Sequence, residues 1–293
     1  RACPSAEPFP IPVANMPKKV LLVLTSVDKY PDGSPTGWYL PEAVHPYQKF
    51  VDAGFEVEWA SITGTASCDP SSIDASKEDK ICMDFWNDAK MKALTEKQMR
   101  LADADPAAYD AVFFAGGFGV MWDFPESKAA QDIIKTMYKA GKPVAAVCHG
   151  PIVFANIEID GEHILKGKEC TGFTNAEENA VGKYSIVSKP SGPGSNEDVL
   201  KEVCSAHSFP RTLVPAAVPV ASTSRLRDGI CTCALFRNCC RCLFLCSVQA
   251  QKGGLFQDGG DFQPKVCVAG NVFTGQNPSS AAPLADEIVK ALA

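Results

Sequence analysis

The stretch that most constrains the fold of this chain is Pro143-Val144-Ala145-Ala146-Val147-Cys148-His149-Gly150-Pro151. Its apolar run, residues 144–147, has the length and the small or β-branched side chains of a buried parallel strand. Gly150 and Pro151 end that run, and Ile152-Val153-Phe154 continues with an apolar pattern that a helix can accommodate. The stretch therefore predicts a sharp strand-to-helix corner with a cysteine at its tip.

Cys148 lies where a nucleophile lies in such a corner. The small residues two positions before and after it, Ala146 and Gly150, would let the strand and the helix pack closely. The first amides of the following helix favour a thiolate, and the amide of His149 is a candidate oxyanion donor. A buried structural cysteine is the alternative, because most free cysteines are of that kind. The His-Gly-Pro sequence after Cys148 favours the nucleophile.

The composition argues against several classes of protein. A net charge of −6 and the lack of a lysine- or arginine-rich stripe argue against binding to nucleic acid. No apolar run approaches the roughly 20 residues of a membrane span, so no membrane association is expected. Of the thirteen cysteines, the six outside 204–246 are scattered singly, which is typical of a reducing compartment. We expect a cytoplasmic protein, with the nucleus or an organelle as alternatives.

Apolar strands alternate with helical segments before the corner. The patterns predict strands over 19–25, 55–60 and 110–115, and helices over 47–53, 92–103 and 127–140. This alternation predicts a doubly wound α/β fold, in which ligands bind at the carboxyl ends of the strands. The third strand ends in Gly116-Gly117-Phe118-Gly119, which lacks the spacing of a phosphate-binding loop. The amide of Gly117 is instead a second candidate oxyanion donor at the same sheet edge as Cys148.

Two further acidic positions are candidates for the site. Glu42 stands among aromatic and apolar residues, where burial would raise its pKa and suit it to proton transfer; an ordinary acid in a first helical turn is the alternative. His45, three residues later, is interpreted as packing or substrate lining. Glu177 and Glu178 follow Thr171-Gly172-Phe173-Thr174, and adjacent acids at a helix start are usually dipole partners on a solvated face.

The long polar segment 61–90 is predicted to be an active-site wall.

The C-terminal part of the chain departs from this regularity. Residues 265–269 and 271–274 predict a hairpin, and a helix follows over 280–292. Residues 203–251 carry seven of the thirteen cysteines and match neither flank in periodicity. The CxxC within 239–242 and the CxC at 231–233 lack the paired spacing of a zinc site. We therefore predict a cysteine-rich insertion, artefactual or lineage-specific, such as a translated intron. It would interrupt one domain over 17–293, preceded by a disordered arm over 1–16.

Four motifs in order resemble the DJ-1/PfpI superfamily, and most closely its Hsp31-like, glutathione-independent glyoxalases. They are Lys18-Lys19-Val20-Leu21, Glu42-Ala43-Val44-His45-Pro46, Ala145-Ala146-Val147-Cys148-His149-Gly150-Pro151 and Thr171-Gly172-Phe173-Thr174. The C-terminal Gly270-Asn271-Val272-Phe273-Thr274-Gly275-Gln276-Asn277-Pro278 adds to the match. The resemblance covers about 17–202 and 252–293, so the segment 203–251 has no counterpart in it.

The resemblance implies a flavodoxin-like sheet with helices on both faces, usually in a homodimer. It also implies conversion of methylglyoxal, a 2-oxoaldehyde, to D-lactate without a cofactor, through a hemithioacetal on Cys148. By position, Cys148 would be the nucleophile, His149 the general base, Glu178 the residue that orients the histidine, and Glu42 a hydrogen-bond partner of the thiol. No residue set near Cys148 has metal-ligand spacing, so no metal is expected there.

Two other functions remain open at this point. A chaperone or redox-stress sensor would need only an oxidisable Cys148 beside a carboxyl group. A peptidase or amidase could use the same nucleophile, and hydrolysis of peptides without aldehyde turnover would identify it.

Overall fold

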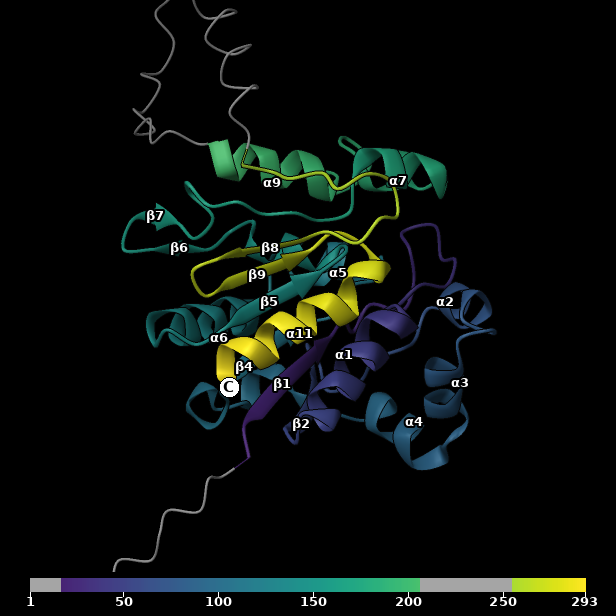
Figure 1. Ribbon diagram of the computed structural model, residues 1–293. Coiled ribbons are helices and arrows are strands. Elements are labelled where there is room, and N and C mark those ends of the chain that lie inside the picture. The colour runs from purple at the N-terminus through teal and green to yellow at the C-terminus, as the bar shows by residue number, and fades with distance from the viewer. Residues whose placement is uncertain (1–16, 206–254) are drawn as a thin grey trace, which may run out of the picture.

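The computed structural model describes residues 17–205 and 255–293 (Figure 1). The arm predicted over 1–16 lies outside these residues, as does the predicted insertion from 206 to 251, so both remain predictions. Within the described part, no helix is both long and apolar enough to cross a bilayer.

Seven strands form one sheet in the order β3-β2-β1-β4-β5-β9-β8. Neighbouring strands run parallel, except that β8 is antiparallel to β9. The predicted flavodoxin-like, doubly wound sheet is thereby confirmed, and so is the C-terminal hairpin. A separate small sheet pairs β6 with β7. The strands are β1 Lys19–Leu24, β2 Glu56–Ser61, β3 Met99–Arg100, β4 Ala111–Phe114, β5 Val144–Val147, β6 Glu158–Ile159, β7 Glu162–His163, β8 Val266–Ala269 and β9 Val272–Gly275.

Both faces of the large sheet are covered, which explains why its central strands are apolar along their whole length. In β1, Leu21 and Val23 belong to one hydrophobic cluster, whereas Val20, Leu22 and Leu24 belong to the cluster on the opposite face. Helix α6 packs on the first face, and α1 with α11 covers the second (Figure 1). The helices are α1 Leu40–Asp52, α2 Pro70–Ala75, α3 Lys80–Asn87, α4 Ala89–Glu96, α5 Val120–Asp123, α6 Lys128–Lys139, α7 Asn175–Ala180, α8 Tyr184–Val187, α9 Asn196–Ser205 and α11 Ala281–Leu292.

The segment predicted as a polar wall is mostly helical. It folds into α2 and α3 and leads into α4, and each helix begins at an aspartate whose side chain accepts a backbone N–H of the first turn. These aspartates are Asp69, Asp79 and Asp88. An isolated bridge between Trp38 and Cys68 places the start of this segment beside the loop that precedes α1.

Two predicted helices have different bounds. The helix predicted over 92–103 ends at Glu96, because Met99 and Arg100 pair with Ala60 and Ser61 as β3 at the sheet edge. Helix α1 begins at Leu40 rather than near Tyr47, since Pro41 is tolerated in a first helical turn. This earlier start places Glu42 inside the helix.

The chain segments on either side of 206–254 both contact Cys170. Helix α9 continues through Ser205, so the first three residues of the predicted insertion, 203–205, are helical. Cys204 of α9 lies with its sulfur 2.9 Å from that of Cys170. The chain resumes where Leu255 accepts the N–H of Cys170 at 3.0 Å and Phe256 pairs with Cys170.

Candidate active site

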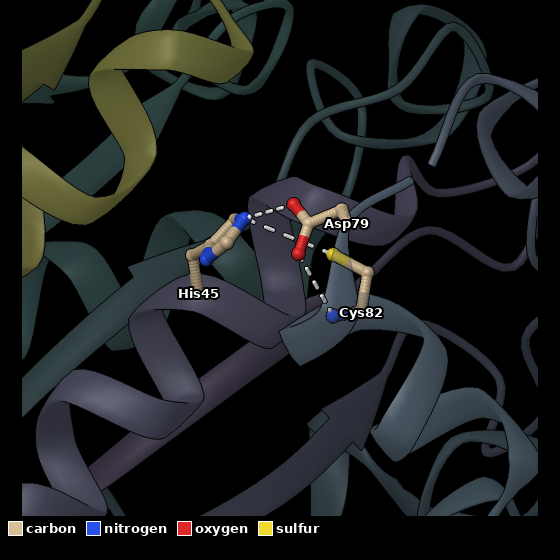
Figure 2. A group of neighbouring side chains, drawn as sticks. All are labelled: His45, Asp79 and Cys82. Carbon is tan, nitrogen blue, oxygen red and sulfur yellow. Dashed lines mark hydrogen bonds and ion pairs between the residues drawn. The ribbon is translucent and has the colours of Figure 1, made fainter. Parts of the chain in front are cut away.

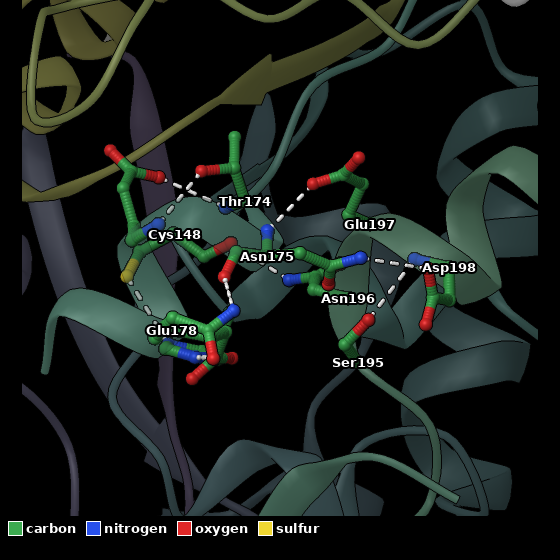
Figure 3. A network of polar contacts seen from close by, with 11 residues as sticks. Cys148, Thr174, Asn175, Glu178, Ser195, Asn196, Glu197 and Asp198 are labelled. Carbon is green, nitrogen blue, oxygen red and sulfur yellow. Dashed lines mark hydrogen bonds and ion pairs between the residues drawn. The ribbon is translucent and has the colours of Figure 1, made fainter. Parts of the chain in front are cut away.

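Cys148 stands at the carboxyl end of β5 in a left-handed backbone conformation, with φ of 60°. Such a φ is uncommon for a residue with a side chain, and its surroundings must hold it. The Cys148 N–H donates to Gly275 O at 2.9 Å, while its carbonyl accepts from Phe173 N and from Asn196 Nδ2, both at 2.8 Å. Figure 3 shows the Asn196 side chain reaching the corner from the start of α9. The predicted strand-to-helix corner is therefore present and fixed from three sides.

The small residues around Cys148 have the predicted packing role. A Cβ atom on Gly150 would lie 2.8 Å from Phe114 O of the neighbouring strand and 3.5 Å from Ala146 Cβ. Any side chain at position 150 would push the corner away from the sheet. The helix expected after the corner is shorter than predicted, because residues 150–154 form only a 3₁₀ turn.

The side chain of His149 contacts both Cys148 and Glu178. The Cys148 sulfur is 3.3 Å from His149 Nδ1, and His149 Nε2 is 2.7 Å from Glu178 Oε1. A carboxylate can only accept, so Nε2 carries the ring proton and Nδ1 presents its lone pair to the thiol. The imidazole is therefore oriented as a base toward sulfur. All three side chains are at least 97% buried.

Two phenylalanine rings pack against the imidazole. The centroid of the His149 ring is 4.3 Å from that of Phe118 and 4.5 Å from that of Phe173. Phe118 comes from the glycine turn after β4, and Phe173 follows Thr171-Gly172. This packing leaves the ring little freedom to rotate away from the sulfur. The sequence motifs contain both residues but do not indicate this contact.

Glu42 projects from α1 into the same site and is fully buried. A Cβ on Gly116 would lie 2.3 Å from Glu42 Oε2 and 3.1 Å from Cys148 Cβ, so only glycine at 116 lets the carboxyl group approach the cysteine. Burial raises the pKa of Glu42 to about 8, and the neighbouring Cys148 thiol and Gly116 N–H lower it only in part. Within the described residues, neither carboxyl oxygen makes a hydrogen bond of normal geometry. Glu42 is thus mainly protonated at pH 7.

The expected thiolate at Cys148 needs correction. Burial, followed by the nearby Glu42 carboxylate, raises the pKa of the thiol well above its ordinary value. The expected stabilisation by a helix N-terminus is weak because the 3₁₀ turn is too short to sum many peptide dipoles. Deprotonation must therefore be coupled to a proton acceptor in contact with sulfur, and His149 Nδ1 is in that position.

The backbone amides proposed as oxyanion donors are free. Among the described residues no hydrogen-bond acceptor is found for the N–H of Gly117 or of His149. Gly117 has a φ of 103°, and a Cβ there would lie 2.4 Å from Gly37 O, so this turn requires glycine. Both amides belong to turns at the carboxyl ends of adjacent parallel strands, β4 and β5.

The prediction that the paired acids lie on a solvated face is wrong. Glu177 and Glu178 are both fully buried. Glu177 closes the capping box of α7 and organises the loops around the site. Its carboxylate accepts four hydrogen bonds, from Thr174 N, Phe262 N, Gln276 Nε2 and Asn277 Nδ2, at 2.9, 2.8, 3.1 and 2.8 Å. Four donors satisfy the buried charge, so this acid is a structural anchor beside the one that contacts His149.

Asn196 is a functional position that the sequence analysis missed. The Ser195-Asn196-Glu197-Asp198 run has the pattern of a helix start, and Ser195 Oγ accepts the N–H of Asp198 at 3.2 Å. Asn196 is thereby left free to bind the Cys148 carbonyl. Figure 3 also shows Glu197 and Asp198 accepting from Asn175, at 2.6 and 2.9 Å, which joins α9 to α7.

Comparison with known proteins defines the class to which this fold and site belong. The model of the DJ-1/PfpI family matches residues 37–206, more than half of the chain. The chain therefore belongs to the DJ-1/PfpI family.

Relatives within the family carry more specific names. Glyoxalase 3 of Candida albicans is 40% identical over 178 residues, which cover 58% of this chain and 75% of the relative. Glutathione-independent glyoxalase HSP31 of Saccharomyces cerevisiae is 37% identical over 201 residues, covering 64% of this chain and 81% of the relative. The crystal structure of glyoxalase III from Candida albicans matches with a TM-score of 0.69 and 29% identity, over 94% of this chain and 97% of that one. Rapid Encystment Protein 24 kDa of Francisella tularensis matches with a TM-score of 0.70 and 28% identity, over 94% and 99%.

Proposed function

We propose that this protein is a glutathione-independent glyoxalase, which converts methylglyoxal and related 2-oxoaldehydes to D-lactate and related 2-hydroxy acids. The observation that carries the proposal is the contact of one imidazole with both the Cys148 sulfur and Glu178, at 3.3 and 2.7 Å. The names of the relatives agree with it. Such an arrangement can remove the thiol proton and later move a carbon-bound proton of the adduct.

The first step is addition of the Cys148 sulfur to the aldehyde carbon. His149 Nδ1 takes the thiol proton as the S–C bond forms, and the carbonyl π electrons move to oxygen. The amides of Gly117 and His149 would stabilise that oxyanion. Glu178 stabilises the imidazolium that results. The imidazolium then returns its proton to the oxygen, which gives a neutral hemithioacetal and a neutral His149.

The second step moves hydrogen between the two carbons of the adduct. A base removes the proton from the former aldehyde carbon, and an enediol forms. The adjacent carbon then gains a proton while the hydroxyl on the sulfur-bearing carbon loses one, which yields a thioester. His149 is the base, and protonated Glu42, which lies near Cys148, can supply the acid. Water cleaves the thioester, which releases the 2-hydroxy acid and returns the thiol.

This sequence is redox-neutral, because one carbon is oxidised while its neighbour is reduced. It needs neither an external hydride acceptor nor glutathione, since the cysteine supplies the sulfur. We therefore propose that the reaction needs no cofactor.

The test is lactate formation by the purified protein. With methylglyoxal as the sole substrate and EDTA present, D-lactate should accumulate, as measured with a stereospecific lactate dehydrogenase. Glutathione should not be needed. Lactate that appears only after addition of glutathione, or not at all, would refute the proposal.

The burial of Cys148 weighs against the two other functions. Its side chain is only 3% exposed, which suits a small aldehyde better than a peptide chain. A redox sensor depends on an accessible thiol of low pKa, whereas burial raises the pKa of this one. Peptide hydrolysis or rapid peroxide oxidation at Cys148 without aldehyde turnover would reverse this preference.

Replacement of Glu178 by glutamine should separate addition from turnover. Glutamine keeps the shape but can donate to Nε2, and it removes the charge that supports imidazolium, so turnover should fall by about 10²-fold. Methylglyoxal should still protect Cys148 from iodoacetamide at equilibrium, because the sulfur that forms the adduct is unchanged and Glu178 affects only the rates of proton transfer. The matched control is Glu158→Gln, an exposed acid on β6. Unchanged turnover in Glu178→Gln would remove this residue from the mechanism.

We further propose that the enzyme acts as a cytoplasmic homodimer without nucleic-acid or membrane partners. The acidic net charge of −6 supports the absence of nucleic-acid binding.

A further inference from the structure

A second histidine, far from Cys148 in the sequence, lies in a cluster that the proposed glyoxalase reaction does not use. His45 of α1 faces Asp79 and Cys82, which cap and begin α3 (Figure 2). His45 Nε2 is 2.7 Å from Asp79 Oδ2 and 3.8 Å from Cys82 Sγ. One potential ligand atom from each residue lies within 4.8 Å of the other two.

Local structure explains why these three side chains converge. Asp79 is the N-cap of α3, and its Oδ1 accepts the N–H of Cys82 at 3.1 Å. That bond fixes the carboxylate and turns its other oxygen toward α1. Cys82 is fully buried, whereas the side chains of His45 and Asp79 are 24% and 30% exposed. A small ion could therefore enter from the surface and meet the sulfur at the inner end.

The geometry differs from that of a nucleophile with its base. In the active site, His149 contacts the sulfur with Nδ1 and the carboxylate with Nε2. At His45 the same nitrogen, Nε2, faces both the carboxylate and the sulfur. One nitrogen cannot donate a proton to Asp79 and also accept one from Cys82. In the metal-free site Nε2 donates its proton to Asp79. With that proton on Nδ1 instead, a nitrogen lone pair, a carboxylate oxygen and a sulfur would converge on one point, which fits a cation.

We propose that His45, Asp79 and Cys82 form a binding site for a divalent transition-metal ion of the Zn²⁺ type. Imidazole nitrogen, carboxylate oxygen and thiolate are the three ligand types that zinc takes in proteins. Tetrahedral zinc would place its nitrogen and sulfur ligands ~3.5 Å apart and its nitrogen and oxygen ligands ~3.3 Å apart. The existing N···S distance of 3.8 Å is close to this, and the N···O distance of 2.7 Å must widen.

Binding would proceed with loss of one proton. The S–H bond of Cys82 breaks, the proton leaves to solvent, and a sulfur lone pair binds the metal. The proton on His45 Nε2 that faces Asp79 would move to Nδ1 through solvent, which frees the Nε2 lone pair for the metal without a further net loss of protons. Asp79 would keep its Oδ1 on the Cys82 N–H, so the helix cap would hold the ligand in place. Three protein ligands leave a fourth position for water. The ion would join α1 to α3, and the site does not depend on the glyoxalase activity.

The test is a titration of the full chain with Co²⁺ as the probe, under a non-chelating reductant. Because other cysteines can also bind cobalt, the measured quantity is the difference between variants. Wild type should bind one equivalent more than Cys82→Ser, and this additional equivalent should add sulfur-to-cobalt charge-transfer absorption to the spectrum. Asp79→Asn should show the same loss, and asparagine still caps α3. The control is Cys267→Ser, a buried thiol on β8 outside the cluster.

Thermal unfolding gives a second readout. Zn²⁺ should raise the Tm of wild type and Cys267→Ser, and raise it less in Asp79→Asn and His45→Gln. These last two changes affect half-buried residues, so they keep the test valid even if Cys82→Ser does not fold. Equal titrations of wild type, Asp79→Asn and His45→Gln would overturn the site. So would a loss of the same equivalent in Cys267→Ser.

Discussion

Replacing Cys148 with serine is expected to lower methylglyoxal turnover by about 10³-fold or more. A serine hydroxyl has a far higher pKa than a thiol, so His149 could not generate the nucleophile at neutral pH. The fold should survive, because the bonds that hold the corner use the backbone N–H and carbonyl of residue 148. Serine is also smaller than cysteine and creates no clash.

The measurement compares turnover and thermal unfolding in the same preparations. Cys267→Ser is the matched control, since it removes another buried thiol while leaving the site intact. It should retain wild-type turnover. If Cys148→Ser keeps more than a small fraction of the activity, the nucleophile is wrongly assigned. If both variants lose activity equally, the loss reports general damage rather than chemistry.

The corner at Cys148 could be predicted because its determinants are local. A short apolar strand, small residues at 146 and 150, and the Gly-Pro break all lie within nine residues. The close approach of Gly150 to Ala146 and to the neighbouring strand is the physical reason for that pattern. The positions of β1, β4 and β5 and the C-terminal hairpin likewise follow from continuous apolar runs.

The errors arose where distant parts of the chain decide the outcome. Glu177 and Glu178 look like solvent-facing acids, but the donors that bury Glu177 include residues 262, 276 and 277, far along the chain. Strand β3 exists only because β2 offers it an edge. The three aspartate caps at 69, 79 and 88 were local signals for helices and could have been recognised.

The chemistry of the thiol also depends on burial that no motif specifies. The sequence suggested a helix N-terminus and hence a thiolate, whereas full burial raises the thiol pKa. The cluster of His45, Asp79 and Cys82 was equally hidden, because 34 residues separate the histidine from the aspartate. Only the packing of α1 against α3 brings them together.

Glu42 is expected to make the protein less stable as the pH rises from about 5 to above 8. In the unfolded chain this carboxyl group ionises near 4.5, but in the fold burial raises its pKa to about 8. Between these values the unfolded state gives up a proton that the folded state retains. The contribution of Glu42 to the free energy of unfolding is therefore largest below pH 4.5. It falls as the pH rises and is gone above the pKa that Glu42 has in the fold. The full change in unfolding free energy is on the order of 3–5 kcal/mol.

Glu42→Gln should remove this part of the pH dependence, because the amide stays neutral at every pH. The measurement is urea unfolding of wild type and variant at several values between pH 5 and 8.5, under reductant. The stability of the variant relative to wild type should rise steadily across this range. Asp123→Asn is the control: burial raises the pKa of Asp123 to about 6, so its contribution should end at lower pH.

The same variant tests the role of Glu42 at the sulfur. Below pH 8 the protonated carboxyl group can donate to the Cys148 sulfur, and above pH 8 its negative charge opposes formation of the thiolate. The alkylation rate of Cys148 by iodoacetamide, measured against pH, should therefore change in Glu42→Gln and stay as in wild type in Asp123→Asn. Parallel unfolding curves for wild type and Glu42→Gln across the whole pH range would show that Glu42 is ionised in the fold. Together with identical alkylation profiles, they would exclude it as the acid that acts beside Cys148.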